Sequence, residues 1–249
     1  MRKNGFRVRM ESQSLVEMEF YGVIGGMSFF EDDDYVNVTQ VLKTLNDMGE
    51  VETLRMFYNS PGGDAYDGFQ IANRLDFLRE QGKIGKIEAH AEGLVASAAT
   101  LPFVKSDVRI MRNGSRFMIH LPISFGMGNE HEMRSQADRL HQTTEEAIDL
   151  YETVANLDRA EIQKAMEVET WYSPKDAAGI GFATEVAEPF AIAACMSEKI
   201  RLNLLHLPDD LEVIDPSERV INPPETSLDD AEYQAMYEAK HPKNWSKAS

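Results

Sequence analysis

A single serine among small residues is the first feature of this chain that could carry chemistry. The segment is Gly93-Leu94-Val95-Ala96-Ser97-Ala98-Ala99. Residues 84–90 alternate in the manner of a strand, and residues 96–101 have the composition of a buried helical turn, which predicts Ser97 at a helix N-terminus. Backbone N–H groups and the positive end of the helix dipole would stabilise an oxyanion there. Ser97 is therefore a candidate nucleophile, although such a serine is more often a cap or a packing residue.

A second candidate segment is the turn Asn59-Ser60-Pro61-Gly62-Gly63-Asp64. It follows a strand-like run at residues 53–58 and precedes an amphipathic helix at residues 67–79. Proline fixes its own φ, while the glycines permit positive φ and a close approach of backbone to a ligand. The turn could therefore aim an N–H group outward, and the alternative is an ordinary strand-to-helix turn.

The third candidate is a histidine at the end of an apolar strand, in Arg116-Phe117-Met118-Ile119-His120-Leu121-Pro122. It is the one histidine of the six with this placement. A satisfied core histidine is the alternative interpretation. Polar or helical surroundings are predicted for His131, His141, His206 and His241.

Together, the three motifs resemble those of the ClpP-type serine peptidases in order and spacing. The resemblance runs from residues 21–25 to residues 181–186, roughly two thirds of the chain. It implies that Ser97 is the nucleophile and His120 the general base. It also implies that the N–H groups of Gly63 and Ala98 form the oxyanion hole.

The third member of the implied triad departs from the family pattern, which has aspartate at this position. The matching residue here is Glu169, four residues before the serine that opens the predicted helix at residues 173–178. A glutamate can hold an imidazole tautomer, but its extra methylene changes its reach. Glu167 would point to the same side in an extended segment, and Asp158 and Asp176 are further alternatives.

Alternating strands and helices must position these residues. The pattern predicts strands at 15–24, 53–58, from 84, at 108–111 and up to His120, with a helix at 38–48 that begins near Asn37 or Thr39. Such alternation is typical of βαβ units on a central sheet, and the resemblance implies an α/β, crotonase-like ClpP fold. Metal-ligand and phosphate-binding motifs are absent from the sequence, so we expect no cofactor and no metal.

A long helix is predicted at residues 130–156, with a mostly apolar stripe that requires a partner surface. The partner is either the chain's own sheet or, as the resemblance implies, another subunit. ClpP-like peptidases carry a handle helix here, through which two rings interlock and enclose the active sites. We therefore expect a homo-oligomeric ring, with stacked rings as an extension. The stripe consists of Met133, Ala137, Leu140, Thr144, Ala147, Tyr151 and Val154.

Length, cysteine count and net charge limit the domain organisation, the cellular location and the partners that we expect. A chain of 249 residues can bury one substantial core and add an extension. The single cysteine, Cys195, excludes an intrachain disulfide, and the sequence has neither a leader nor a long apolar run, so we expect a cytoplasmic protein. A net charge of −17 disfavours nucleic acid and anionic membranes as partners.

The sequence predicts a peptidase domain at residues 1–188 and a C-terminal region at 189–249. A helix is expected at 191–207, followed by an acidic, proline-containing arm at 208–249 with a short helix at 228–240. A disordered tail is the alternative. Such an extension and the segment 169–173 resemble the ClpP-like head-maturation proteases of tailed bacteriophages.

This resemblance implies protein substrates among scaffold, capsid or portal-associated proteins. Two alternatives stay open. The chain could be the proteolytic chamber of an ATP-driven degradation machine, fed by an unfoldase. It could also be a structural ring component that hydrolyses nothing, since fold alone does not imply activity.

Overall fold

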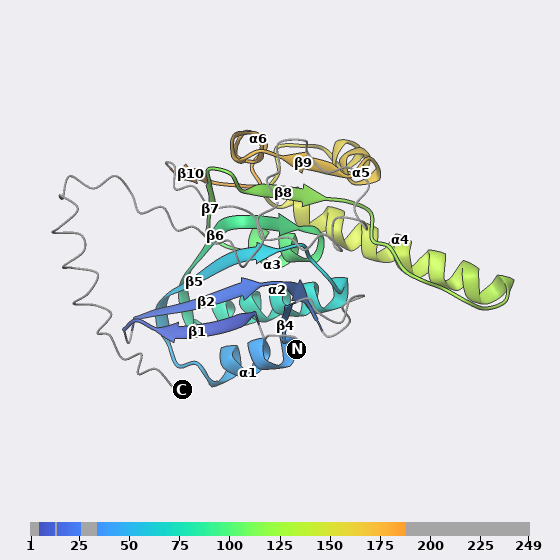
Figure 1. Cartoon of the computed structure of the whole chain (residues 1–249). Helices are drawn as coiled ribbons and strands as arrows, with labels where there is room; N and C mark the ends of the chain where they lie inside the picture. The colour runs from blue at the N-terminus through green and yellow to red at the C-terminus, as the bar shows by residue number, and fades with distance from the viewer. Residues whose placement is uncertain (1–4, 13, 26–33, 188–249) are drawn as a thin grey trace, which may run out of the picture. The chain divides into compact units, whose positions relative to one another are not determined.

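A computed structural model of the chain describes residues 5–12, 14–25 and 34–187 (Figure 1). In this part of the chain, no helix combines the length and the apolar character needed to cross a membrane. In chain order the elements are β1 (Phe6–Met10), β2 (Leu15–Tyr21), β3 (Val23–Ile24), β4 (Tyr35–Val36), α1 (Val38–Asp47), β5 (Val51–Ser60), α2 (Ala65–Glu80), β6 (Ile84–Ala96), a 3₁₀ helix η1 (Ser97–Ala99), α3 (Thr100–Val104), β7 (Val108–Arg112), β8 (Arg116–Ile119), α4 (Glu130–Glu152), α5 (Arg159–Glu167), β9 (Thr170–Tyr172), α6 (Pro174–Gly179) and β10 (Glu185–Ala187).

One mixed sheet organises the fold. Among the described residues its path is β1-β2-β5-β6-β7-β10, and β8 pairs with both β6 and β9. The pairs β1–β2 and β8–β9 are antiparallel, while the other ladders of this sheet are parallel. Parallel neighbours require crossovers, and α1, α2 and α3 lie in these connections. The α/β architecture predicted from the alternation is therefore confirmed.

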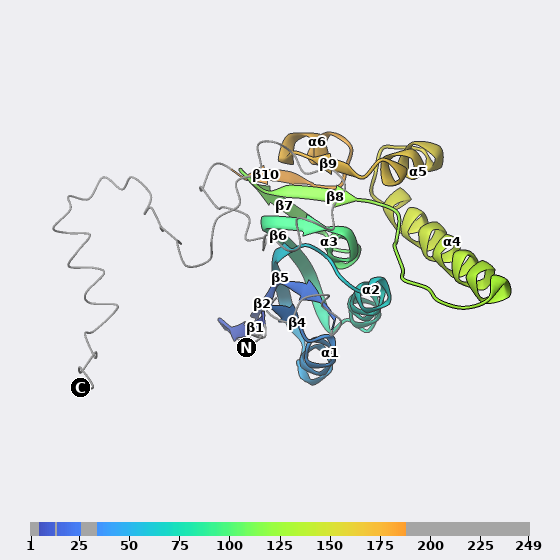
Figure 2. The same ribbon diagram turned by 45° about the vertical axis from the view of Figure 1, so that its right-hand side comes forward.

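The helices α1, α2 and α3 cover one face of the sheet (Figure 2). Side chains alternate along each strand, so every second residue faces these helices. In β5, for example, Leu54, Met56 and Tyr58 are fully buried, whereas Arg55 and Phe57 lie on the other face and are partly exposed. This alternation produces one continuous apolar core between the sheet and the helices.

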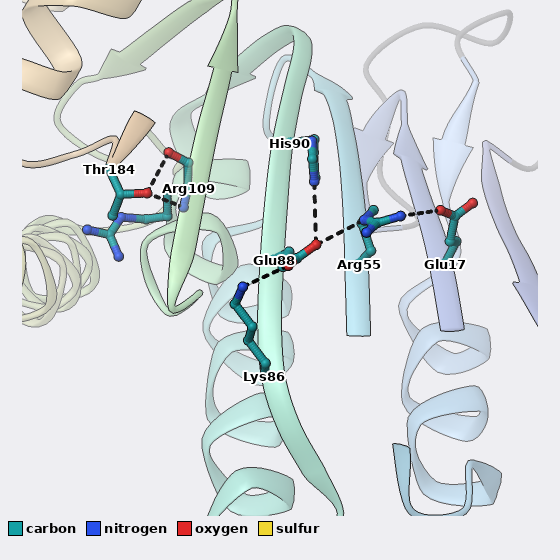
Figure 3. Close-up of polar contacts among 7 residues, drawn as sticks. All are labelled: Glu17, Arg55, Lys86, Glu88, His90, Arg109 and Thr184. Atoms are coloured by element: carbon teal, nitrogen blue, oxygen red, sulfur yellow. Dashed lines mark hydrogen bonds and ion pairs between the residues drawn. The ribbon is translucent and has the colours of Figure 1, made fainter. Parts of the chain in front are cut away.

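The opposite face of the sheet carries a charge network that crosses three parallel strands (Figure 3). Arg55 on β5 donates to Glu17 on β2 and to Glu88 on β6, each at 3.0 Å. Lys86 also donates to Glu88 at 2.9 Å, and His90 Nε2 lies 3.9 Å from the same carboxylate. Cross-strand pairs of opposite charge stabilise a sheet modestly, and this network satisfies charges that the pleat places side by side.

A chain of aromatic contacts links the sheet to the helix that follows Ser97. Tyr58 contacts Phe103 of α3 at a centroid distance of 5.5 Å, and Phe103 contacts Phe117 of β8 at 5.9 Å. Phe117 in turn stacks on Phe182 at 4.7 Å. Buried aromatic pairs add to the free energy of unfolding beyond their buried area. They fix α3, and with it the turn at Ser97, against β5 and β8.

Several element predictions need correction. The expected strand at 15–24 is two strands, because Gly22 adopts a φ of +104° and turns the chain from β2 into β3. The strand that begins at Ile84 extends beyond the predicted residues 84–90 and continues through Gly93 to Ala96. The helix expected at 130–156 ends at Glu152. Of the two predicted caps of α1, Asn37 accepts the N–H of Gln40, at 3.0 Å.

The stripe predicted along α4 divides into two parts. Thr144, Ala147 and Tyr151 are buried against their own chain, whereas Met133 and Ala137 are exposed. Figure 2 shows the first turns of α4 extending away from the sheet, with the connection from β8 beside them. That connection and the start of the helix expose large apolar side chains, namely Ile123 (66 %), Phe125 (80 %), Met127 (99 %) and Met133 (37 %). The C-terminal region predicted at 189–249, with its boundary, lies outside the described residues.

Candidate active site

The candidate residues come together where β5, β6 and β8 end. Ser60 near the end of β5 pairs with Val95 of β6, and Ala96 of β6 pairs with Met118 of β8. Parallel strands place their carboxyl ends at one edge, which is where α/β sheets form their sites. The residues that follow these strand ends are the Pro-Gly-Gly turn, Ser97 and, one residue past β8, His120.

Ser97 is the first residue of η1 and occupies the sharp turn that directly follows β6. Its φ is +52°, in the left-handed region that non-glycine residues rarely adopt. Thr100 Oγ1 donates to the Ser97 carbonyl at 2.6 Å, and the hydroxyls of Thr100 and Tyr151 are also 2.6 Å apart. The side chain of Thr100 thus connects the serine turn to α4. A strained strand-to-helix turn of this kind exposes a serine hydroxyl at the edge of a sheet.

His120 forms the direct partner of Ser97. The distance between Ser97 Oγ and His120 Nε2 is 2.7 Å, which is hydrogen-bond distance for a nucleophile and its base. Burial lowers the pKa of His120, and the nearby carboxylate of Glu169 opposes that shift. A lowered pKa keeps the imidazole neutral near pH 7, so Nε2 can accept the serine proton.

Glu169 lies on the other side of the imidazole. Its Oε2 is 3.9 Å from His120 Nδ1, and its Oε1 accepts a hydrogen bond from Trp171 Nε1 at 3.2 Å. The side chain is 2 % exposed. Glu169 follows the end of α5 with a φ of +51°, the conformation in which helices commonly end at glycine. The tight end of α5 therefore turns this carboxylate inward, toward His120.

Ser97 and Glu169 are the only non-glycine residues with positive φ in the part of the chain that the structure describes. Each such conformation costs roughly 1–3 kcal/mol and persists when its surroundings impose it. The two strained positions lie on either side of His120. Strained backbone at Ser97 and at Glu169, the two residues that flank the imidazole of His120, points to a functional site.

The alternative acids are placed elsewhere. Glu167 is the last residue of α5 rather than part of an extended segment, and its exposed carboxylate accepts from Gln163 at 3.0 Å. Asp158 caps the start of α5, and Asp176 accepts from Ser173 at 2.6 Å. The premise that Glu167 points to the same side as Glu169 is therefore wrong, because the chain is helical there.

The Pro-Gly-Gly turn fits closely against the serine turn. A Cβ on Gly62 would lie 2.6 Å from Ser97 Cβ and 2.9 Å from Ala98 N, so a side chain is excluded there. Ile24 of β3 holds the turn through Ile24 N–Gly62 O at 2.7 Å and Asp64 N–Ile24 O at 3.0 Å. These bonds leave the Gly63 N–H pointing away from β3. Ala98 is in the first turn of η1, whose N–H groups lack helical acceptors.

Sequence reasoning missed several residues that build this site. Gly68 lets α2 approach the serine turn, because a Cβ there would lie 2.6 Å from the Ala98 carbonyl. A glycine inside a predicted helix is a signal that could have identified it. Thr100 bonds to Ser97 and to Tyr151, and Trp171 bonds to Glu169. These contacts depend on how the chain is folded, so no local sequence pattern predicts them.

Other places for a ligand are separate from this site. Within residues 5–12, 14–25 and 34–187, no group of three or more His, Cys, Asp or Glu side chains is arranged to hold a metal. A groove of about 1000 Å³ lies between α2 and α4, and none of its lining residues belongs to the Ser97 site.

Comparison with known proteins is consistent with this arrangement. Residues 22–190 match the family model described as Clp protease. An ATP-dependent Clp protease proteolytic subunit from Deinococcus radiodurans is 21 % identical over 154 residues, which cover 61 % of this chain and 73 % of that protein. Proteolytic subunit 2 from Treponema pallidum is 26 % identical over 155 residues, covering 61 % and 74 %.

A solved structure shares the fold. A ClpP1 mutant from Listeria monocytogenes superimposes with a TM-score of 0.57 at 20 % identity. The match covers 69 % of this chain and 91 % of that one. It establishes the ClpP-type, crotonase-like fold expected from the sequence.

Proposed function

This chain belongs to the Clp protease family and is a serine peptidase, and from that premise we propose that it hydrolyses peptide bonds through an acyl-enzyme on Ser97. The observation that carries the proposal is the 2.7 Å contact between Ser97 Oγ and His120 Nε2. Glu169 orients the imidazole, and the N–H groups of Gly63 and Ala98 bind the oxyanion. No other pair of described side chains combines a strained serine turn with a neutral imidazole.

The reaction follows from these positions. Ser97 Oγ attacks the carbonyl carbon of the substrate while its proton passes to His120 Nε2. The carbonyl oxygen becomes the oxyanion, which the two N–H groups stabilise, and Glu169 stabilises the imidazolium. Collapse of the intermediate breaks the C–N bond, and the leaving amine takes the proton from Nε2. Water then hydrolyses the ester by the same steps, with His120 as its base.

The Ser97→Ala variant tests the nucleophile. We expect it to abolish peptide hydrolysis and labelling by a fluorophosphonate, with an unchanged circular dichroism spectrum. Ser12→Ala, at an exposed serine between β1 and β2, is the matched control and should label and cleave normally. Cleavage by pure Ser97→Ala protein would show that the nucleophile lies elsewhere, and it would also revive the idea of a ring component without activity at this site.

For the biological setting, we propose that the substrates are scaffold, capsid or portal-associated proteins during bacteriophage head maturation. The support is the resemblance of the segment 169–173 and of the C-terminal extension to that branch of the family. The names of the relatives favour a second candidate, a proteolytic chamber that works with an ATP-driven unfoldase. Cleavage of a folded scaffold protein without ATP supports the first setting. Strict dependence on an added unfoldase and ATP supports the second.

The assembly we propose is a homo-oligomeric ring whose contacts include the first turns of α4. Large apolar side chains in this region are exposed in the structure. Burying apolar area contributes about 25 cal/mol per Å², so covering them favours association. Met133→Glu with Leu140→Glu should reduce the oligomer in light scattering, and Gln142→Glu on the same exposed half is the control. A wild-type protein that is monomeric at micromolar concentration would contradict the proposed ring. A charge at Ala147 is unsuitable, because this residue is buried in its own subunit.

We also propose that the protein acts in the cytoplasm and that residues 208–249 form a separable docking arm. Deleting the arm should leave cleavage of a small peptide nearly unchanged, because every proposed catalytic residue precedes Pro174. Processing of the protein substrate or assembly should be impaired. Equal behaviour of both chains in peptide cleavage, protein processing and oligomer size contradicts a docking role.

A further inference from the structure

Trp171 lies against the carboxylate that faces His120. Its indole N–H donates to Glu169 Oε1 at 3.2 Å, while Glu169 Oε2 is 3.9 Å from His120 Nδ1. We propose that Trp171 is a positioning residue, whose indole fixes the Glu169 carboxylate so that its second oxygen is presented to His120. This inference rests on the proposed function and adds to it a residue that acts through Glu169.

The two carboxylate oxygens have different partners, and this division is the core of the argument. Oε1 is bound by the indole, and Oε2 faces the imidazole. With a side chain that is 2 % exposed, the carboxylate is oriented by protein groups rather than by bulk water. Holding one oxygen therefore determines where the other one points.

The backbone ties the indole and the imidazole to one ladder. Strands β8 and β9 pair antiparallel, with Met118 opposite Trp171 and Ile119 opposite Thr170. His120 directly follows β8 and Glu169 directly precedes β9, so both residues lie at the same end of this ladder. The indole, the carboxylate and the imidazole are thus held by one short antiparallel ladder and the residues at its end, so the indole can control a distance at the site.

The chemistry of the indole suits this task. An indole N–H is a donor only, so it cannot compete with the carboxylate for the proton on His120 Nδ1. It is also neutral, so it fixes the acid without adding a charge beside the imidazole. A glutamate has more rotatable bonds than an aspartate, and fixing it costs more side-chain entropy. Trp171 offsets the freedom of the longer acid that this chain has at position 169.

The first test is kinetic, on the full-length protein with a fluorogenic peptide. Trp171→Phe keeps an aromatic ring and removes the donor. We expect kcat to fall about tenfold, as for loss of one hydrogen bond to a charged group, with KM within about twofold. Tyr172→Phe removes a polar group from the next position of β9 and is the matched control, expected to retain activity within about twofold.

A double-mutant cycle separates positioning from support of the strand. In a Glu169→Ala background, Trp171→Phe should change kcat by less than about twofold, because the acid that it positions is absent. An equal loss in both backgrounds would mean that the indole acts through packing of β9 and would overturn the proposal. An unchanged kcat in the wild-type background would overturn it as well.

The second test does not need activity. In Ser97→Ala protein, the pKa of His120 is followed by NMR titration of the imidazole protons. Glu169 raises this pKa, so a less well oriented carboxylate should lower it. We expect Trp171→Phe to lower the pKa of His120 and Tyr172→Phe to leave it unchanged. No change with Trp171→Phe contradicts positioning even if Ser97 proves to be the nucleophile, and a Ser97→Ala protein that still cleaves contradicts the proposed function alone.

Discussion

Two histidines of the described residues, the buried His90 and the partly buried His120, lie in contrasting environments. His120 bonds to Ser97 and faces Glu169. His90 lies on the face of the sheet away from the helices, near Phe57 and the charge network of Figure 3, and neither of its ring nitrogens has a hydrogen-bond partner. Burial lowers the pKa of both, that of His90 to about 4. Burial, helped at His90 by the charges of Arg112 and Arg55, therefore favours the neutral imidazole at both positions, and what distinguishes His120 is its contact with Ser97 and Glu169.

The largest expected effect is the loss of the base. His120→Ala should lower kcat/KM by about 10⁴-fold or more, comparable with loss of the serine, because triad residues act as a unit. His90→Gln should stay within about threefold of the wild-type rate, since His90 contacts no reacting group. Steady-state kinetics on both variants checks this contrast. Similar losses in the two variants would abolish it.

The acid beside His120 comes next. Glu169→Gln should lower kcat/KM by about 10²-fold, because the amide keeps the shape and loses the charge that stabilises the imidazolium. The control is Glu167→Gln, an exposed residue two positions earlier, expected within about twofold of wild type. A normal Glu169→Gln enzyme with an inactive Glu167→Gln enzyme would transfer the role. Normal rates in both would indicate a Ser-His dyad.

His90 should instead affect the pH dependence of the free energy of unfolding. Its pKa is near 6.5 in the unfolded chain and about 4 in the folded one, so the unfolded state binds the proton more readily. The free energy of unfolding therefore decreases as pH falls from 6.5 to 4, and His90→Gln removes this contribution. We expect the variant to gain about 3 kcal/mol at pH 4 relative to its change at pH 7.5. Urea unfolding at both pH values measures it, and an identical change at both contradicts burial of a neutral His90.

The smallest effect is a shift of the pH–rate profile. Because burial lowers the pKa of His120, the acid limb of kcat/KM should have its midpoint below pH 6.5. His90→Gln should not move this limb, since His90 is already neutral there. Residual activity of Glu169→Gln should show the limb at lower pH, because Glu169 raises the pKa of His120. An acid limb above pH 6.5 would contradict the lowered pKa.

Local sequence patterns predicted much of the fold and part of the site. Alternation and glycine placement predicted the order of strands and helices along the chain, Ser97 at a helix start and His120 at a strand end. They failed at Gly22, where one positive φ splits an apolar run into two strands. A strand-period pattern contains no information on such a turn, because glycine is compatible with both paths.

The acid shows a different reason for failure. Glu169 and Glu167 are equivalent in composition, and what distinguishes them is where α5 ends. Helix ends are the least predictable part of an element, because one residue in the left-handed region reverses the direction of the next side chain. Trp171 depends on that same reversal and on the β8–β9 register, so a sequence pattern alone could not assign it.

The positive φ values of Ser97 and Glu169 bear on how this protein can evolve. At either position glycine would relieve the backbone and remove the functional group in one substitution. Selection for thermal stability alone would therefore favour the loss of chemistry before any loss of structure. In a lineage that no longer needs to cleave its substrate, we expect substitutions that raise stability and remove activity, and we expect them first at positions 97 and 169.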